Sequence, residues 1–133
     1  MEPVPLFDPV KAGRPMRVAA FMSGSGTNIV RLLELEASLR EQEGSSPFEV
    51  VFVFSDRSDG ASRGEAIALE QGLPYASYDI RAFHRRRGLR RTATTPEGLA
   101  ARRAFDRVPA LLTNAFEIDV IALGGYMSYT TLQ

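Results

Sequence analysis

The chain has 133 residues, of which 44% are hydrophobic and 24% charged, a composition that fits one globular domain and argues against disorder or a fibrous repeat. Sixteen basic residues balance sixteen acidic ones, so no overall field favours nucleic acid or an anionic membrane as a partner. The absence of cysteine excludes a disulfide framework and a thiolate metal site, and we expect no bound metal.

Residues 1–15 are rich in proline and show no periodicity, which predicts an extended N-terminal arm ahead of a domain that spans residues 16–133. This arm lacks the basic end and the apolar run of a secretory signal, and no stretch of the chain reaches membrane-spanning length. We therefore expect a cytoplasmic protein without a membrane partner.

Short apolar runs rich in β-branched and aromatic residues predict four strands, at residues 17–22, 48–54, 75–78 and 118–123. Helical patterns separate them, over residues 28–43, 61–71 and 96–115. Pro109 should kink or split the last helix. Residues 79–95 lose apolar periodicity and gather arginine, which predicts a surface loop. The alternation of strands and helices predicts an α/β, Rossmann-like domain: a parallel sheet with helices on both faces.

The most informative motif is S-G-S-G-T-N, residues 23–28, between the first strand and the helix after it. Glycine lets the backbone turn tightly and approach a ligand, while the first amides of a helix point outward and attract an anion. The motif therefore predicts a phosphate site. The alternative is a plain turn in which Thr27 or Asn28 only caps the helix. Ile29 occupies the third glycine position of the dinucleotide fingerprint, and no lysine follows as in Walker A.

Asp56 comes directly after the second predicted strand, within S-D-R-S-D-G. An acidic residue at that position could hold the ribose of a cofactor. The surrounding serines and glycine are more typical of a turn, so we interpret Asp56 as a turn residue.

Three segments, in order, carry a resemblance to the phosphoribosylglycinamide formyltransferase family: M-R-V-A-A-F-M-S-G-S-G-T-N, V-F-V-F-S-D-R-S-D-G-A and I-D-V-I-A-L-G-G-Y-M. The resemblance runs from about Met16 to Met127. It implies a formyltransferase N-terminal domain whose co-substrate is 10-formyltetrahydrofolate and whose acceptor is the amine of glycinamide ribonucleotide, in purine biosynthesis. The methionyl-tRNA branch fits less well, because it opens with a G-T-P-type turn.

The resemblance also implies site residues. It assigns the substrate phosphate to Gly24, Ser25, Gly26, Thr27 and Asn28, with Arg86 as a second contact. It assigns the pterin pocket of the folate to Gly125, Tyr126, Met127 and Ser128, where serine replaces the family's frequent arginine. The alternatives are a solvated basic loop for Arg86 and ordinary packing at a strand end for Tyr126 and Met127.

The family's catalytic asparagine and histidine, in an N-x-H-P-type motif, and its later aspartate have no counterpart in these residues. The one histidine, His84, lies among arginines and is interpreted as a surface residue, while Asp119 begins a strand at the end opposite a ligand crevice. We therefore expect no formyltransferase activity from this chain alone.

Two interpretations stay open. The chain is either the N-terminal portion of a longer formyltransferase or a short non-catalytic homologue that binds a phosphorylated ligand or partner. The first is favoured, because the chain stops just past the fourth strand with sheet and crevice uncovered. Such an uncovered surface predicts self-association.

Overall fold

The computed structural model describes residues 7–58, 60, 62–88, 95–128 and 131–132. Its centre is one sheet of four strands in the order β3-β2-β1-β4, and every neighbouring pair is parallel. The strands are β1 (Met16–Met22), β2 (Phe48–Ser55), β3 (Tyr75–Ser77) and β4 (Val120–Leu123). The predicted parallel α/β fold is confirmed.

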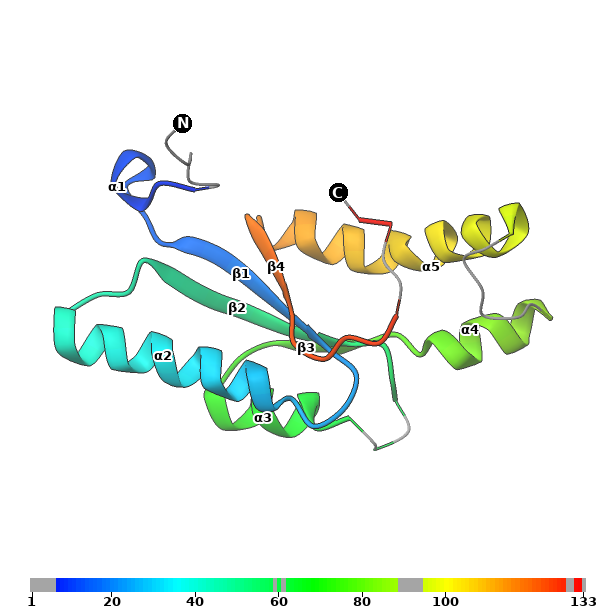
Figure 1. Ribbon diagram of the computed structural model, residues 1–133, viewed down its shortest axis with the longest axis horizontal. Coiled ribbons are helices and arrows are strands. Elements are labelled where there is room, and N and C mark those ends of the chain that lie inside the picture. The colour runs from blue at the N-terminus through cyan, green and yellow to red at the C-terminus, as the bar shows by residue number, and fades with distance from the viewer. Residues whose placement is uncertain (1–6, 59, 61, 89–94, 129–130, 133) are drawn as a thin grey trace.

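Helices cover both faces of this sheet (Figure 1). The helices are α1 (Pro9–Ala12), α2 (Thr27–Glu43), α3 (Gly64–Gln71), α4 (Ile80–Arg87) and α5 (Pro96–Ala115). One core cluster joins the sheet to α2 and α3, and a second joins it to α4 and α5. No helix in the described part of the chain is long and apolar enough to cross a membrane.

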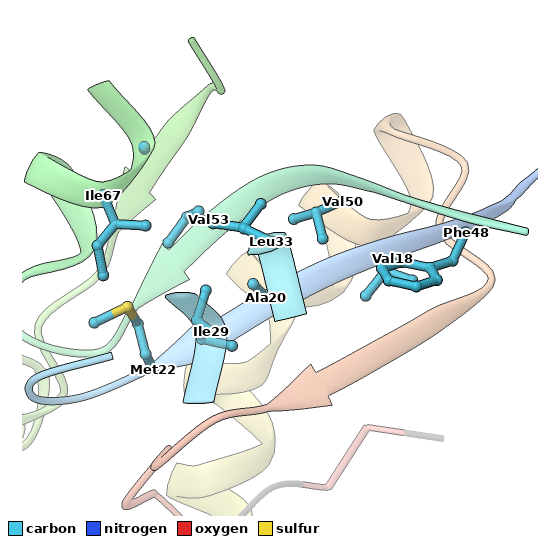
Figure 2. Close-up of a cluster of buried hydrophobic side chains, with 10 residues drawn as sticks. Val18, Ala20, Met22, Ile29, Leu33, Phe48, Val50, Val53 and Ile67 are labelled. Atoms are coloured by element: carbon cyan, nitrogen blue, oxygen red, sulfur yellow. The ribbon is translucent and has the colours of Figure 1, made fainter. Parts of the chain in front are cut away.

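Strand β1 supplies both clusters, because successive side chains of a strand point to opposite faces. Val18, Ala20 and Met22 face α2 and α3, where they meet Ile29 of α2 and side chains of β2 (Figure 2). Ala19 and Phe21 face α4 and α5. A strand buried on both faces needs an uninterrupted apolar run, and this explains why its sequence pattern was clear.

The prediction of a surface loop over residues 79–95 is wrong for residues 80–87, which form α4, and residues 89–94 lie outside the described part of the chain. Asp79 caps this helix by accepting a hydrogen bond from the Ala82 amide at 2.9 Å, and Gly88 ends it in the left-handed conformation. Its buried face holds Ile80 and Phe83, one turn apart. Two apolar positions among arginines give a weak periodic signal, so the pattern did not reveal the helix.

His84 is buried, so the prediction of a surface histidine is also wrong. Its Nδ1 atom lies 2.8 Å from the carbonyl oxygen of Ile80, one turn earlier in α4. The imidazole also packs edge-on against Phe83. Four residues after Ile80, His84 shares the inward face of the helix, which residue type alone does not indicate.

Two further predictions are corrected in part, one for the N-terminal arm and one for Pro109. Within the predicted extended arm, Pro9–Ala12 forms a helical turn that is capped by the Asp8 carboxylate; residues 1–6 lie outside the described part. Pro109 does not split α5, which runs as one helix with Pro109 buried inside it. The missing N–H removes one hydrogen bond of that helix, and burial of the ring offsets part of this loss.

Asp119 lies just before β4, at the end of the sheet opposite the carboxyl ends of the strands, as predicted. The Arg14 guanidinium donates to both of its oxygens, at 2.7 and 3.1 Å, and the Arg17 amide adds a third bond at 2.8 Å. The hydrogen bonds from Arg14 hold the pKa of Asp119 below its ordinary value. This carboxylate therefore ties the chain before β1 to the start of β4.

A bulge interrupts the pairing of β1 with β2. Val18 pairs with Val50 and Ala19 pairs with Phe52, so Val51 is the extra residue of β2. The carboxylate of Glu36, a buried residue of α2, accepts the Val50 amide at 2.9 Å and pairs with Arg40 at 2.6 Å. The helix side chain thus satisfies a strand N–H beside the irregularity.

We expect Glu36→Ala to lower the free energy of unfolding by about 1–3 kcal/mol, because the buried Val50 amide loses its acceptor. Glu36→Gln keeps an acceptor oxygen for the Val50 amide and loses only the charge that pairs with the half-exposed Arg40, which solvent screens on the Arg40 side, so its loss of stability should be smaller. Urea unfolding of both variants measures the difference. Equal losses in the two variants would contradict this role of the Glu36–Val50 hydrogen bond.

Candidate functional site

A pocket of about 260 Å³ lies at the carboxyl ends of β1, β2 and β4. Parallel α/β sheets bind their ligands at this edge. Its lining comes from three segments, residues 23–28 after β1, Arg57 after β2, and Gly124, Gly125 and Met127 after β4. The structure therefore places all five predicted phosphate residues of the glycine turn in one concave surface.

The glycine turn leaves the start of α2 open toward this pocket. Gly26 occupies the cap position without a side-chain cap, and the Val30 amide makes the bond to its carbonyl oxygen at 2.9 Å. The amides of Thr27, Asn28 and Ile29 precede that bond, so they have no carbonyl partner within the helix. The alternative in which Thr27 or Asn28 caps the helix is wrong, because Gly26 is the cap residue.

The two glycines of the turn serve different purposes. Gly26 has φ 70°, and a Cβ built on it would lie 2.5 Å from Ile67 Cδ1 and 2.7 Å from Met22 Cε. A Cβ built on Gly24 would meet no atom within 4 Å. Gly26 is therefore required by the backbone and the core, whereas the space beside Gly24 is open to a ligand.

The segment after β4 forms the opposite wall. A Cβ on Gly124 would lie 2.5 Å from Ile29 Cδ1, so only glycine lets the chain pass so close to the first turn of α2. Gly125 follows in the left-handed conformation with φ 71°. These two glycines bring the segment predicted for the folate directly beside the segment predicted for the phosphate.

Asp56 lies in a bend directly after β2, as its sequence context predicted, but only 2% of its surface is accessible. Its Oδ1 atom accepts the Ser23 hydroxyl at 2.7 Å, and its Oδ2 atom accepts the Ser128 hydroxyl. Ser23 Oγ in turn accepts the Met127 amide at 2.8 Å. One carboxylate thus connects the chain after β1, β2 and β4.

Arg57 is the charged residue among the described residues that line the pocket, and neither the motifs nor the resemblance predicted its place there. It follows Asp56 at the end of β2, beside the central strand that leads into the glycine turn. One sequence feature could have indicated Arg57: it is a basic residue that comes directly after a strand predicted to lie beside the strand of the glycine turn. Its charge adds to the positive end of the α2 dipole.

Arg86 does not line this pocket. It is exposed near the end of α4, in a separate hollow of about 410 Å³ that Tyr78, Phe83 and Arg87 also line. The Arg87 guanidinium lies over the Phe83 ring, 4.3 Å from its centre. Because residues 80–87 form a helix rather than a loop, the arginines are held on the outside of α4 instead of reaching across the edge.

The four residues predicted for the pterin pocket divide into three groups. Gly125 and Met127 line the pocket, and Ser128 is buried against Asp56. The ring of Tyr126 packs instead against Phe21, 5.4 Å between centres, and Phe54, 6.4 Å. Burial raises the pKa of the Tyr126 phenol well above its ordinary value, and the charges of Asp56 and Asp106 act in the same direction.

No family model and no curated protein matches this chain. Solved structures do match. Glycinamide ribonucleotide transformylase 1 from Geobacillus kaustophilus is 22% identical to this chain, with a TM-score of 0.59. The match covers 87% of this chain and 50% of the transformylase. The phosphoribosylglycinamide formyltransferase from Campylobacter jejuni is 21% identical with a TM-score of 0.62 and the same coverage.

A formyltetrahydrofolate deformylase from Burkholderia mallei matches as well, at 18% identity and a TM-score of 0.55, over 88% of this chain and 33% of that one. Likeness at these identities is a likeness of fold. The chain spans about half the length of the solved formyltransferases it matches. The resemblance drawn from the three motifs is confirmed at the level of the fold.

Proposed function

We propose that this chain is the N-terminal part of a formyltransferase that moves a formyl group from 10-formyltetrahydrofolate to the amine of glycinamide ribonucleotide, and that it supplies the substrate-phosphate site. The observation that carries the proposal is the pocket at the carboxyl edge, where the open start of α2 meets the glycines after β4. The fold shared with one half of such transferases supports it.

A phosphate monoester suits this pocket chemically. The amides at the start of α2 are donors without helical partners, and the helix dipole favours a negative charge there. The Thr27 hydroxyl, 3.2 Å from Ser25 Oγ, and the Arg57 side chain line the same space. The phosphate would therefore meet backbone donors, a hydroxyl and one cation.

The segment 125–128 forms the proposed pterin wall, with Gly125 and Met127 facing the pocket. Its position beside the glycine turn would bring the formyl donor next to the phosphorylated acceptor. No residue of the chain is assigned a catalytic role, and the chain alone is expected to be inactive. A non-catalytic homologue that binds a phosphorylated ligand would use the same phosphate pocket but would not need folate.

The test is a titration of the isotope-labelled chain with glycinamide ribonucleotide and with inorganic phosphate. We expect the amide resonances of Gly26, Thr27 and Asn28 to shift first. Thr27→Ala should weaken binding by about 1 kcal/mol, the cost of one hydrogen bond. Gly24→Ala should weaken it more, because its new methyl group enters space that the protein leaves open.

Arg86→Ala is the matched control, since Arg86 lines a different hollow. It should leave phosphate binding unchanged, whereas Arg57→Ala should reduce it. A response confined to the α4 arginines, with the turn amides unmoved, would refute the proposed phosphate site. Added 10-formyltetrahydrofolate should shift the Gly125 and Met127 resonances if the chain also contributes the folate wall, and should leave them unchanged in a homologue that binds only the phosphorylated ligand.

A further inference from the structure

Asp56 is a buried carboxylate at the centre of the carboxyl edge, just after β2. Removing a carboxylate from water is costly unless hydrogen bonds replace the lost hydration. The hydrogen bonds to Asp56 come from two serines in segments that follow different strands, Ser23 after β1 and Ser128 after β4. A group that only filled a turn would not need partners from both sides of the pocket.

The two serines belong to the two walls of the pocket. Ser23 begins the glycine turn and lines the pocket itself. Ser128 follows Met127, which lines the pocket from the other side. The Met127 amide donates to Ser23 Oγ at 2.8 Å, so Ser23 is a donor to Asp56 and an acceptor from the opposite wall at once. Asp56 therefore orients the hydroxyl that joins the walls.

The second wall is held at its start by the Gly124 amide, which donates to the Phe21 carbonyl oxygen of β1 at 2.9 Å. The Met127 side chain is 78% exposed, so it contributes little apolar burial. Tyr126 anchors the segment on the opposite face of the sheet, within the core cluster of α4 and α5. The position of Met127 relative to the glycine turn thus depends on its hydrogen bond to Ser23, the hydroxyl that Asp56 orients.

We propose that Asp56 is a positioning residue: it holds the segment 125–128 against the glycine turn and so sets the shape of the anion pocket. The identity of the ligand in this proposal rests on the proposed function. The role of Asp56 in holding the two walls together does not depend on it. Asparagine at this position would preserve that geometry, because its oxygen can accept the Ser23 hydroxyl while its amide donates to Ser128 Oγ. It would also remove a negative charge that lies behind an anion site.

The first measurement needs no ligand. In the 133-residue chain, the Asp56→Ala substitution should speed hydrogen exchange of the Met127 amide about tenfold. The reason is that Ser23 Oγ, which accepts this amide, is no longer oriented by the carboxylate, and a change of about tenfold corresponds to the loss of about one hydrogen bond. Asp56→Asn should exchange like the wild type, and Ser128→Ala should fall between them. Glu36→Ala is the control for global destabilisation, because Glu36 contacts β2 away from this pocket.

The second measurement is a titration with inorganic phosphate, followed at the Gly26 and Thr27 amides. The Asp56→Ala variant should bind phosphate about five- to tenfold more weakly than the wild type, whereas the Asp56→Asn variant should bind phosphate as tightly as the wild type or more tightly. Glu36→Ala should retain the wild-type affinity.

The proposal is overturned if Asp56→Ala behaves like Glu36→Ala in both measurements, or if Asp56→Asn disturbs Met127 as much as Asp56→Ala does. A wild-type chain that ignores phosphate would instead refute the proposed function, and the exchange of the Met127 amide would still decide the role of Asp56.

Discussion

Replacing Phe21 by alanine is expected to lower the free energy of unfolding by about 3–5 kcal/mol, a large share of the 5–15 kcal/mol typical of a whole domain. Phe21 has no accessible surface and lies in the strand that pairs with both β2 and β4. Its ring packs 4.9 Å from Phe54 and 5.4 Å from Tyr126, measured between centres. The variant would leave a cavity at the centre of one core cluster. Urea unfolding measures the loss.

Two controls separate this effect from a general sensitivity to substitution. Phe21→Leu keeps most of the apolar contact and should cost clearly less than alanine. Leu69→Ala removes a side chain that is 81% exposed and should change the stability by no more than about 0.5 kcal/mol. A loss below 1 kcal/mol for Phe21→Ala would show that this cluster does not stabilise the sheet as described.

The second large effect is expected at the glycine turn, where Gly26→Ala should cost roughly 2–3 kcal/mol. One part is the left-handed backbone, which an L side chain adopts at a cost of about 1–2 kcal/mol. The other is the contact of the new methyl group with Ile67 and Met22, whose side-chain ends must shift. Thermal unfolding monitored by circular dichroism measures the sum.

Gly24→Ala is the matched variant, two residues away in the same motif. It has no positive φ and no neighbour near its new methyl group, so its stability should stay within about 0.5 kcal/mol of the wild type. Equal losses in the two variants would contradict the division of roles between the glycines. This pair also guides binding experiments, because only Gly24→Ala can report on the ligand without disturbing the core.

The glycine motif shows how one sequence feature combines two demands. Its position between a buried strand and a helix was predictable, and so was a helix start whose first amides lack carbonyl partners within the helix. The motif did not show why residue 26 must be glycine. A larger side chain there would collide with Ile67 of α3, which packs against the turn and is distant from it in the sequence. Local spacing indicates a turn, and packing decides what each glycine is for.

The arginines of α4 illustrate the opposite case. The family resemblance assigned Arg86 as a second contact to the phosphate, and the sequence pattern predicted a loop around it. The Asp79 cap, the buried Ile80 and Phe83, and the Gly88 end make a helix, and a helix holds its exposed side chains on one outward face. Arg57 lines the pocket instead, because the end of β2 lies beside the end of β1.

The elements with strong local signals could be predicted from the amino-acid sequence. Apolar runs predicted β1 and β2 within one residue of their ends, and the helical patterns predicted the last residues of α2 and α3 and both ends of α5. Such features depend on residues that are neighbours in the chain. The parallel sheet followed from their alternation.

The surroundings of His84, Asp56 and Tyr126 depend on contacts between elements that are distant in the sequence. His84 is buried because α4 turns that face to the sheet, Asp56 because serines from two other connections close over it, and Tyr126 because it faces the cluster of Phe21 and Phe54. A polar residue is buried where its hydrogen-bond partners meet it, and those partners are separated from Asp56 by 33 and 72 residues in sequence. No local pattern contains that information, because folding alone brings such partners together.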